Sequence, residues 1–389
     1  MGIMSNSVSI YQYEVTGEIP GNDHRMWVQQ CLEKNRFEPI DATPDPESTG
    51  WVRFDEHMNS DFGNLASFSF EDYYIFTLRK DVRKVPAALL KNLVEKECGE
   101  WLKERPKLHK VPFGRKREIR ENIHAALLAK SLPDPSVCDV LWNEKTNILS
   151  IASISTKTLD FVEDQFKKTF EGLGLVPIHP IRRAERVLSE EHRPSLDKLN
   201  QASSRDVLLQ IKKNRWLGWD FFLWLMFRSA EGSSEYKIVT DMGPAEPGEI
   251  FIAYLYDRFV LTEEHEDGTR KNSISGPQKD FSEARKSIQS GKNITEALLY
   301  FEKDMLKWKM SLKGDVFAFG SFACPPVKIE KDEMTDPMME RDAVFYERMS
   351  LLETGLQVFE SLFAAFLSDR ISGHWPQILK AMNEWLHKV

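Results

Sequence analysis

The sequence has few cysteines, and this scarcity excludes two classes of protein. Four cysteines occur among 389 residues, and no two of them form a Cys-x-x-Cys pair. A disulfide scaffold or a structural zinc site needs clustered cysteines, whereas scattered ones are typical of a reducing cytosol. We therefore expect a cytoplasmic protein that holds no metal and no other cofactor.

Long apolar runs are also lacking. The longest, residues 221–227, is far shorter than the ~20 residues that a membrane-spanning helix needs. The N-terminus has no basic stretch followed by an apolar one, so no secretory signal is expected. With 41% apolar and 29% charged residues, the composition predicts a soluble globular protein of two or three domains that does not contact a membrane.

An overall positive charge is lacking as well, but one segment is strongly basic. The formal net charge is −8. Residues 103–130 hold nine basic and three acidic side chains, so this window carries +6 and leaves −14 on the rest of the chain. Such an asymmetry indicates a local site for an anionic partner on a body that repels anions.

The first half of the chain predicts an α+β fold. Alternating and β-branched patterns indicate strands at residues 8–15 and 73–78, and a hairpin at 137–154 turning at 143–147. Apolar residues at helical spacing indicate helices at 23–34 and 159–170, the second ended by Gly172. We expect antiparallel sheet units, formed by residues 1–83 and 133–180, with helices on one face.

An insertion at residues 84–132 predicts a projecting arm of two helices. Pro86 suits the first position of a helix, and the second helix is expected at about 115–130. Each helix has one apolar stripe, formed by Leu90, Val94, Cys98 and Trp101 in the first and by Ile119, Ile123 and Leu127 in the second. A basic, proline-broken turn connects the two helices.

The second half divides into a polar segment, 181–280, and a C-terminal α+β region, 281–389. Residues 216–227 predict a buried helix or strand, 262–280 a polar loop, and 281–291 a helix that ends at Gly291. Residues 327–342 are expected to be a charged connection. A last long helix carries an apolar seam that packs into the core or against a second subunit: Phe345, Met349, Leu352, Leu356, Phe359, Phe363 and Phe366.

Motifs for hydrolysis and nucleotide binding are absent. The sequence contains no GxGxxG, phosphate loop, HExxH or GxSxG. One nuclease-like set exists: Asp220 and Glu235 could hold a divalent ion while Lys237 stabilises an attacking water. This set predicts a metal-dependent DNA nuclease as the alternative to a binding protein.

Several short segments, taken in order, resemble the RdgC family of recombination-associated proteins. The arm begins with Lys-Val-Pro-Ala-Ala-Leu-Leu-Lys at 84–91 and ends with Ala-Leu-Leu-Ala-Lys at 126–130. Gly-Trp-Val at 50–52 precedes it, and Gly-Leu-Gly-Leu-Val-Pro-Ile at 172–178 follows. Ile-Gln-Ser-Gly-Lys-Asn-Ile-Thr at 288–295 extends the resemblance, which covers about residues 8–180 and 281–370.

The resemblance implies a non-enzymatic, nucleoid-associated protein that binds double-stranded DNA without sequence preference. Family members form a ring-like homodimer with a positively charged hole, and they restrain RecA-driven strand exchange. The family has also been labelled as an exonuclease candidate. Matching residue by residue, the resemblance assigns DNA contacts to Lys103, Arg105, Lys107, Lys110, Arg115, Lys116, Arg117, Arg120, Lys130 and Lys292.

The chain departs from the family pattern at two places. Residues 181–280 hold extra material, and Leu132 stands where the family tends to carry an aromatic residue after the second arm helix. A stacking role at Leu132 is therefore not expected.

Overall fold

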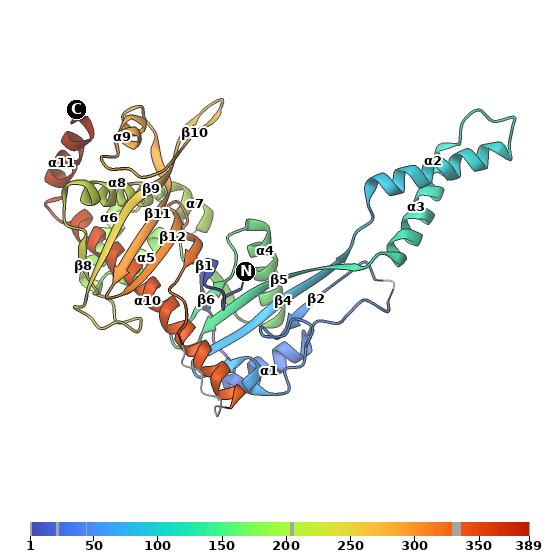
Figure 1. The fold of residues 1–389 in the computed structure, drawn as a ribbon, viewed down its shortest axis with the longest axis horizontal. Coiled ribbons are helices and arrows are strands. Elements are labelled where there is room, and N and C mark those ends of the chain that lie inside the picture. The colour runs from blue at the N-terminus through green and yellow to red at the C-terminus, as the bar shows by residue number, and fades with distance from the viewer. Residues whose placement is uncertain (1, 21–22, 44, 203–205, 329–335, 389) are drawn as a thin grey trace. The chain divides into compact units, whose positions relative to one another are not determined.

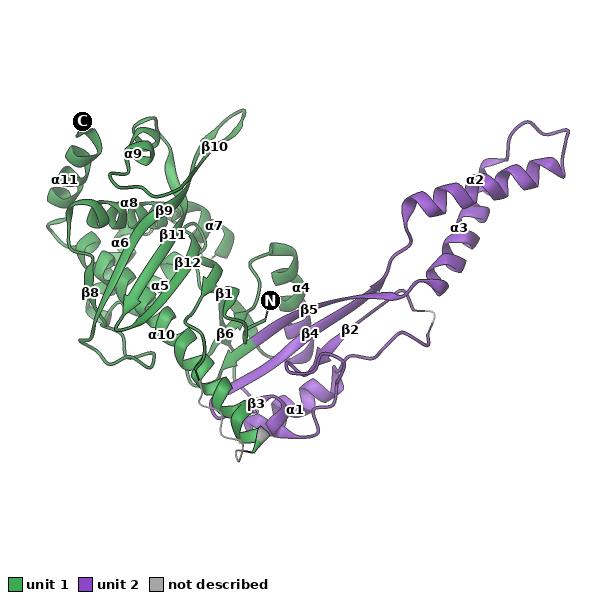
Figure 2. Ribbon diagram, viewed as in Figure 1, with its two compact units in different colours: residues 1–18, 141–163, 172–389 green, residues 19–140, 164–171 purple. Residues whose placement is uncertain are grey.

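Two compact units make up the chain (Figures 1 and 2). The structure, a computed structural model, describes residues 2–20, 23–43, 45–202, 206–328 and 336–388. Unit 1 comprises residues 1–18, 141–163 and 172–389, and unit 2 comprises residues 19–140 and 164–171. The predicted mixture of helices with antiparallel sheet is confirmed.

Unit 1 is built on an antiparallel sheet in the order β10–β9–β11–β12–β13–β1–β6, with β7 beside β1 and β8 beside β9. Apolar side chains alternate along its strands, as in Phe251, Ala253 and Leu255, because one face of the sheet is buried. The strands are β1 (Ser7–Thr16), β6 (Ile148–Ile151), β7 (Gly174–Pro177), β8 (Glu235–Lys237), β9 (Ile250–His265), β10 (Gly268–Ser275), β11 (Asn293–Lys303), β12 (Leu306–Lys313) and β13 (Ala318–Ala323).

The helices of unit 1 are α5 (Pro180–Val187), α6 (Arg193–Leu199), α7 (Val207–Lys213), α8 (Trp216–Glu231), α9 (Ser282–Gln289), α10 (Pro337–Ile371) and α11 (Trp375–His387), with a short 3₁₀ turn, η2 (Glu190–His192). Two of these helices, α8 and α10, pack against each other in the core. The aromatic run predicted as buried is α8. Its Phe221 lies 5.6 Å, centroid to centroid, from both Phe363 and Phe366 of α10.

The apolar seam of α10 lies in the core of unit 1. Phe345, Phe359 and Phe363 are fully buried, and only Leu356 is half-buried. By length and composition alone the helix could cross a membrane, but 78% of its most apolar stretch is buried within the fold. Of the two predicted roles of the seam, core packing is confirmed.

Unit 2 contains a smaller antiparallel sheet in which β4 (Tyr73–Arg83) lies between β2 (Glu47–Val52) and β5 (Pro133–Asn143), and β3 (Ser69–Phe70) also pairs with β4. Its helices are α1 (His24–Lys34), the 3₁₀ turn η1 (Leu65–Ser67), α2 (Ala87–Lys103) and α3 (Phe113–Lys130). The chain passes between the units within β5 and within α4 (Thr156–Thr169).

A row of buried polar side chains runs along one face of β4. Thr77, Arg79, Asp81 and Arg83 are alternate residues, so they share a face, and each is less than 8% exposed. Arg79 and Asp81 form a two-bonded ion pair of 2.7 and 2.8 Å. Thr77 donates to Asp139 at 2.7 Å. Burial of charges at these positions is tolerated because each is paired or hydrogen-bonded.

Arg83 ends β4 and holds three chain segments together. Its guanidinium donates to the carbonyl oxygen of Ile40 at 2.7 Å and of Thr43 at 3.2 Å, and also to that of Ser131. Ser131 caps α3 at its C-terminal end. The α2–α3 hairpin therefore leaves the sheet at Arg83 and returns to the same side chain.

Two sequence predictions are wrong. Residues 262–280 are not a loop, because β9 and β10 pair from Arg258↔Ser275 to His265↔Gly268. Most of these β10 side chains are exposed, so the strand lacks the apolar alternation that reveals a half-buried strand. Residues 337–342 belong to α10 rather than to a connection, whereas 329–335 lie outside the described residues.

A buried histidine makes the stability of unit 1 depend on pH. His179 precedes α5 and is 5% exposed. Burial, together with the charge of Arg182, lowers its pKa from 6.5 to about 4. Between about pH 6.5 and 4, this histidine is protonated in the unfolded chain but neutral in the folded chain. The free energy of unfolding therefore falls as the pH drops from about 6.5 towards 4.

We expect His179→Gln to remove this fall. The difference in stability between pH 7 and pH 4 should shrink by about 3 kcal/mol relative to wild type, as measured by urea unfolding at a series of pH values. His374→Gln, at an exposed histidine of the same unit, keeps His179 and should therefore retain the fall in stability. Equal curves for the two variants would contradict the assignment.

The Arg83 contacts predict a second stability effect. Arg83→Met keeps the apolar length of the side chain but removes the guanidinium donor from three carbonyl oxygens, of which that of Ile40 keeps the N–H of Thr43; this should cost about 2–4 kcal/mol in thermal or urea unfolding. Arg53→Met removes a half-exposed ion pair with Asp55 and should cost less than about 1 kcal/mol. A similar loss in both variants would show that the Arg83 bonds add little.

Candidate nucleic-acid interface

The α2–α3 hairpin extends beyond the ends of β4 and β5 in Figure 2. Pro86 and Pro112 are the residues immediately before α2 and α3, and each has an extended ψ. Proline suits the start of a helix because it has no backbone N–H, and the first N–H groups of a helix have no partner within the helix. The chain after α3 turns extended at Ser131, ahead of Pro133. Prolines thus set three of the boundaries that make this segment a hairpin.

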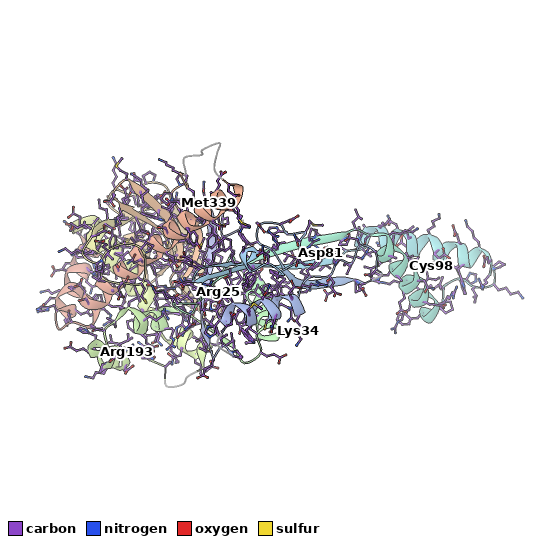
Figure 3. The ribbon with its side chains drawn as sticks, turned by 90° about the horizontal axis from the view of Figure 1, so that it is seen from below. Arg25, Lys34, Asp81, Cys98, Arg193 and Met339 are labelled. Atoms are coloured by element: carbon purple, nitrogen blue, oxygen red, sulfur yellow. The ribbon has the colours of Figure 1, made fainter. Side chains whose placement is uncertain are left out.

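A small core holds the two helices together. Leu90, Val94 and Ile119 are buried, and they pack with six partly buried residues: Val85, Cys98, Trp101, Val111, Ile123 and Leu127. Every residue of the two predicted stripes belongs to this cluster. Figure 3 shows Cys98 within the hairpin and Asp81 on β4. The predicted two-helix arm is confirmed.

All nine basic side chains predicted for this segment are exposed to solvent. Four of them, Lys103, Arg105, Lys107 and Lys110, lie at the end of α2 and in the turn. Another five lie on α3: Arg115, Lys116, Arg117, Arg120 and Lys130. The small core leaves the rest of the hairpin in water, so the whole basic set faces solvent.

The three acidic residues of the window each pair with a neighbouring arginine. Glu104 lies 3.1 Å from Arg105, Glu118 lies 2.7 Å from Arg115, and Glu121 lies 2.8 Å from Arg117. The hydrogen bond from Arg117 to Glu121 raises the pKa of that guanidinium. These pairs are exposed and local, so they lower the positive charge of the hairpin without adding much stability.

Six cations remain without an ion-pair partner in the part of the chain that the structure describes. They are Lys103, Lys107, Lys110, Lys116, Arg120 and Lys130. Each of these side chains is exposed, so its charged group remains hydrated in the free protein and is accessible to an anion. The hairpin is therefore equipped to bind a polyanion.

Lys292, the tenth predicted contact, belongs to unit 1 and not to the hairpin. It follows Gly291, whose φ of +96° ends the turn after α9. Its side chain is half-exposed, and its ammonium donates to Ser290 at 3.3 Å. The assignment of Lys292 to the same interface stays a prediction.

The alternative nuclease residues belong to two elements of unit 1, α8 for Asp220 and β8 for Glu235 and Lys237. Asp220, on α8, accepts a hydrogen bond of 3.0 Å from Arg370. Glu235 and Lys237 flank Tyr236, which packs against Trp224 of α8 at 5.8 Å, so alternation turns these two side chains to the opposite face of β8. No group of three acidic, His or Cys side chains suited to a metal occurs among the described residues.

The sequence reading missed a groove on the hairpin. Phe113, the first residue of α3, is 86% exposed, and it lines a groove between α2 and α3 together with Lys116, Arg117 and Arg120. The signal was present in the sequence as an aromatic residue between Pro112 and a run of basic residues. Only the structure shows that its ring is exposed.

In a comparison with protein-family models, residues 6–190 match the model described as "RdgC: Putative exonuclease, RdgC". This range contains the whole hairpin and the strands on which it stands. A comparison with curated proteins gave no match. The second stretch of predicted resemblance, residues 281–370, lies outside the matched range and stays a prediction.

Proposed function

We propose that this chain, which matches the RdgC family model over residues 6–190, binds double-stranded DNA through the α2–α3 hairpin without reading sequence. Family membership implies a recombination-associated, DNA-binding protein. The observation that supports the hairpin as the contact is its set of six exposed cations without an ion-pair partner, in a chain of net charge −8.

Phosphate contact explains why lysine and arginine suffice. Each cation that meets a phosphate releases a condensed counterion, and this gain does not depend on the base pair. The acidic remainder of the chain repels DNA and so confines binding to the basic hairpin. Phe113 is the only aromatic residue between Lys103 and Lys130, which favours backbone contact over a platform for stacked bases.

The assembly and biological role are proposed from the family. A homodimer that encircles the duplex would bring two hairpins to one DNA and double the number of phosphate contacts. Such a protein would restrain RecA-type strand exchange by occupying the duplex, and it would reside on the nucleoid. With roughly 6–10 phosphate contacts, affinity should fall by about 10³–10⁵ between 50 and 200 mM salt.

Removing three of the unpaired cations should weaken binding to all duplexes alike. In the Lys103→Gln, Lys107→Gln, Lys110→Gln variant, we expect the slope of log affinity against log salt to flatten by about 3, and affinity near 100 mM salt to drop roughly 10²–10³-fold. Fluorescence anisotropy with two duplexes of unrelated sequence measures both quantities.

A matched variant controls for net charge. Lys307, Lys380 and Lys388 are exposed lysines of unit 1, and each is ion-paired to a glutamate. Changing all three to Gln alters the net charge equally but should leave the salt slope unchanged. An equal loss in the two triple variants would refute the hairpin as the contact, because total charge alone would then explain it.

The proposal also predicts that DNA is bound without being degraded. Incubated with Mg²⁺, linear duplex should keep its length on a denaturing gel, with wild-type protein and with Glu235→Ala alike. Shortening by the wild-type protein that Glu235→Ala abolishes would favour the metal-dependent nuclease instead.

A further inference from the structure

The groove on the hairpin has a chemistry that DNA phosphates do not use. It has a volume of about 620 Å³, within the range of pockets that hold organic ligands. Apolar side chains and charged side chains both line it: Ala87, Leu90, Lys91, Val94, Glu95, Phe113, Lys116, Arg117 and Arg120. A phosphodiester has no apolar side that could cover the apolar part.

Phe113 is the most exposed large apolar residue among those that line the groove. Its side chain is 86% exposed, while Leu90 and Val94, which also line the groove, are 8% and 6% exposed and belong to the hairpin core. Covering an exposed Phe side chain gains about 1.5–3 kcal/mol. A ligand with an apolar anchor would obtain that gain next to side chains that already pack in the hairpin core.

The rim of the groove selects an acidic ligand. Lys116 and Arg120 have no ion-pair partner among the described residues. Arg117 is only locally paired with Glu121 at 2.8 Å, and Lys91 lies 3.9 Å from Glu95 in an exposed pair. Positive charge therefore exceeds negative charge around the opening. A carboxylate placed beside Lys116 or Arg120 would meet a charge that is still free.

We propose that this groove docks a short acidic segment of a partner protein, in which Asp and Glu residues flank an apolar or aromatic anchor. The anchor covers Phe113 beside the nearly buried Leu90 and Val94, and the carboxylates contact Lys116 and Arg120, as in other grooves that receive an amphipathic peptide. The same hairpin of a second copy fits less well, because it would bring an equally positive rim to this one.

Peptide and DNA then exclude each other, a consequence that rests on the proposed function. Lys116 and Arg120 serve both ligands, whereas Lys103, Lys107 and Lys110 of the turn are not part of the groove. The segment would act as a regulator that removes the protein from DNA by occupying cations the phosphates need.

The test uses the full chain and a fluorescein-labelled peptide of 14 residues, with Leu and Phe at helical spacing and Glu or Asp elsewhere. The control peptide has Gln and Asn in place of every acid. We expect the acidic peptide to bind at least tenfold more tightly than the control peptide, by anisotropy. Equal binding of the two peptides overturns the proposal.

Substitutions at two equally exposed apolar residues distinguish binding in the groove from non-specific hydrophobic binding. Phe113→Ala should weaken the acidic peptide at least tenfold and change DNA affinity less than twofold. Leu132→Ala, at a residue that is also 86% exposed but does not line the groove, should change neither. If Phe113→Ala leaves peptide affinity unchanged, or instead lowers the mass of the protein in solution, a peptide is not the occupant.

The lysine variant of the turn distinguishes failure of this proposal from failure of the proposed function. The Lys103→Gln, Lys107→Gln, Lys110→Gln protein should bind the acidic peptide like wild type while losing DNA. Peptide bound by wild type should displace labelled duplex in proportion to its occupancy. Retention of DNA at saturating peptide would overturn mutual exclusion.

Discussion

One buried guanidinium holds the base of the hairpin. Arg83 ends β4 and donates to the carbonyl oxygens of Ile40 and Thr43 and to that of Ser131, where the chain returns from α3. Both ends of the hairpin are therefore tied to one side chain. Because Leu90, Val94 and Ile119 give the hairpin a core of its own, the remaining side chains need no further support and stay in solvent.

This construction explains how many like charges are accommodated in one small element. If these charged side chains were buried, each would need an ion-pair or hydrogen-bond partner, or its pKa would shift towards the neutral form. On an exposed hairpin, water and salt screen them at little cost, and their field acts on a ligand that comes within about 10 Å. The acidic composition of the rest of the chain repels anions and so favours binding at the hairpin.

The spacing of apolar residues predicted most of the elements. Leu90, Val94 and Cys98 indicated α2, and the seam from Phe345 to Phe366 indicated α10, because a buried helical face leaves a period that can be read locally. The reading failed at β10, whose side chains face solvent almost throughout. Such a strand is held by backbone bonds to β9, and backbone bonds leave no trace in the side-chain pattern.

By itself, the sequence determined the helices of the hairpin, their basic content and the order of motifs that carries the family resemblance. Only the tertiary structure decided which cations of the hairpin lack an ion-pair partner, that Phe113 is exposed beside them, and that Asp220 is paired with Arg370 while Glu235 and Lys237 face solvent. The physical reason is that ion pairs and burial depend on which side chains fold onto one another, and residues far apart in the chain supply many of those partners.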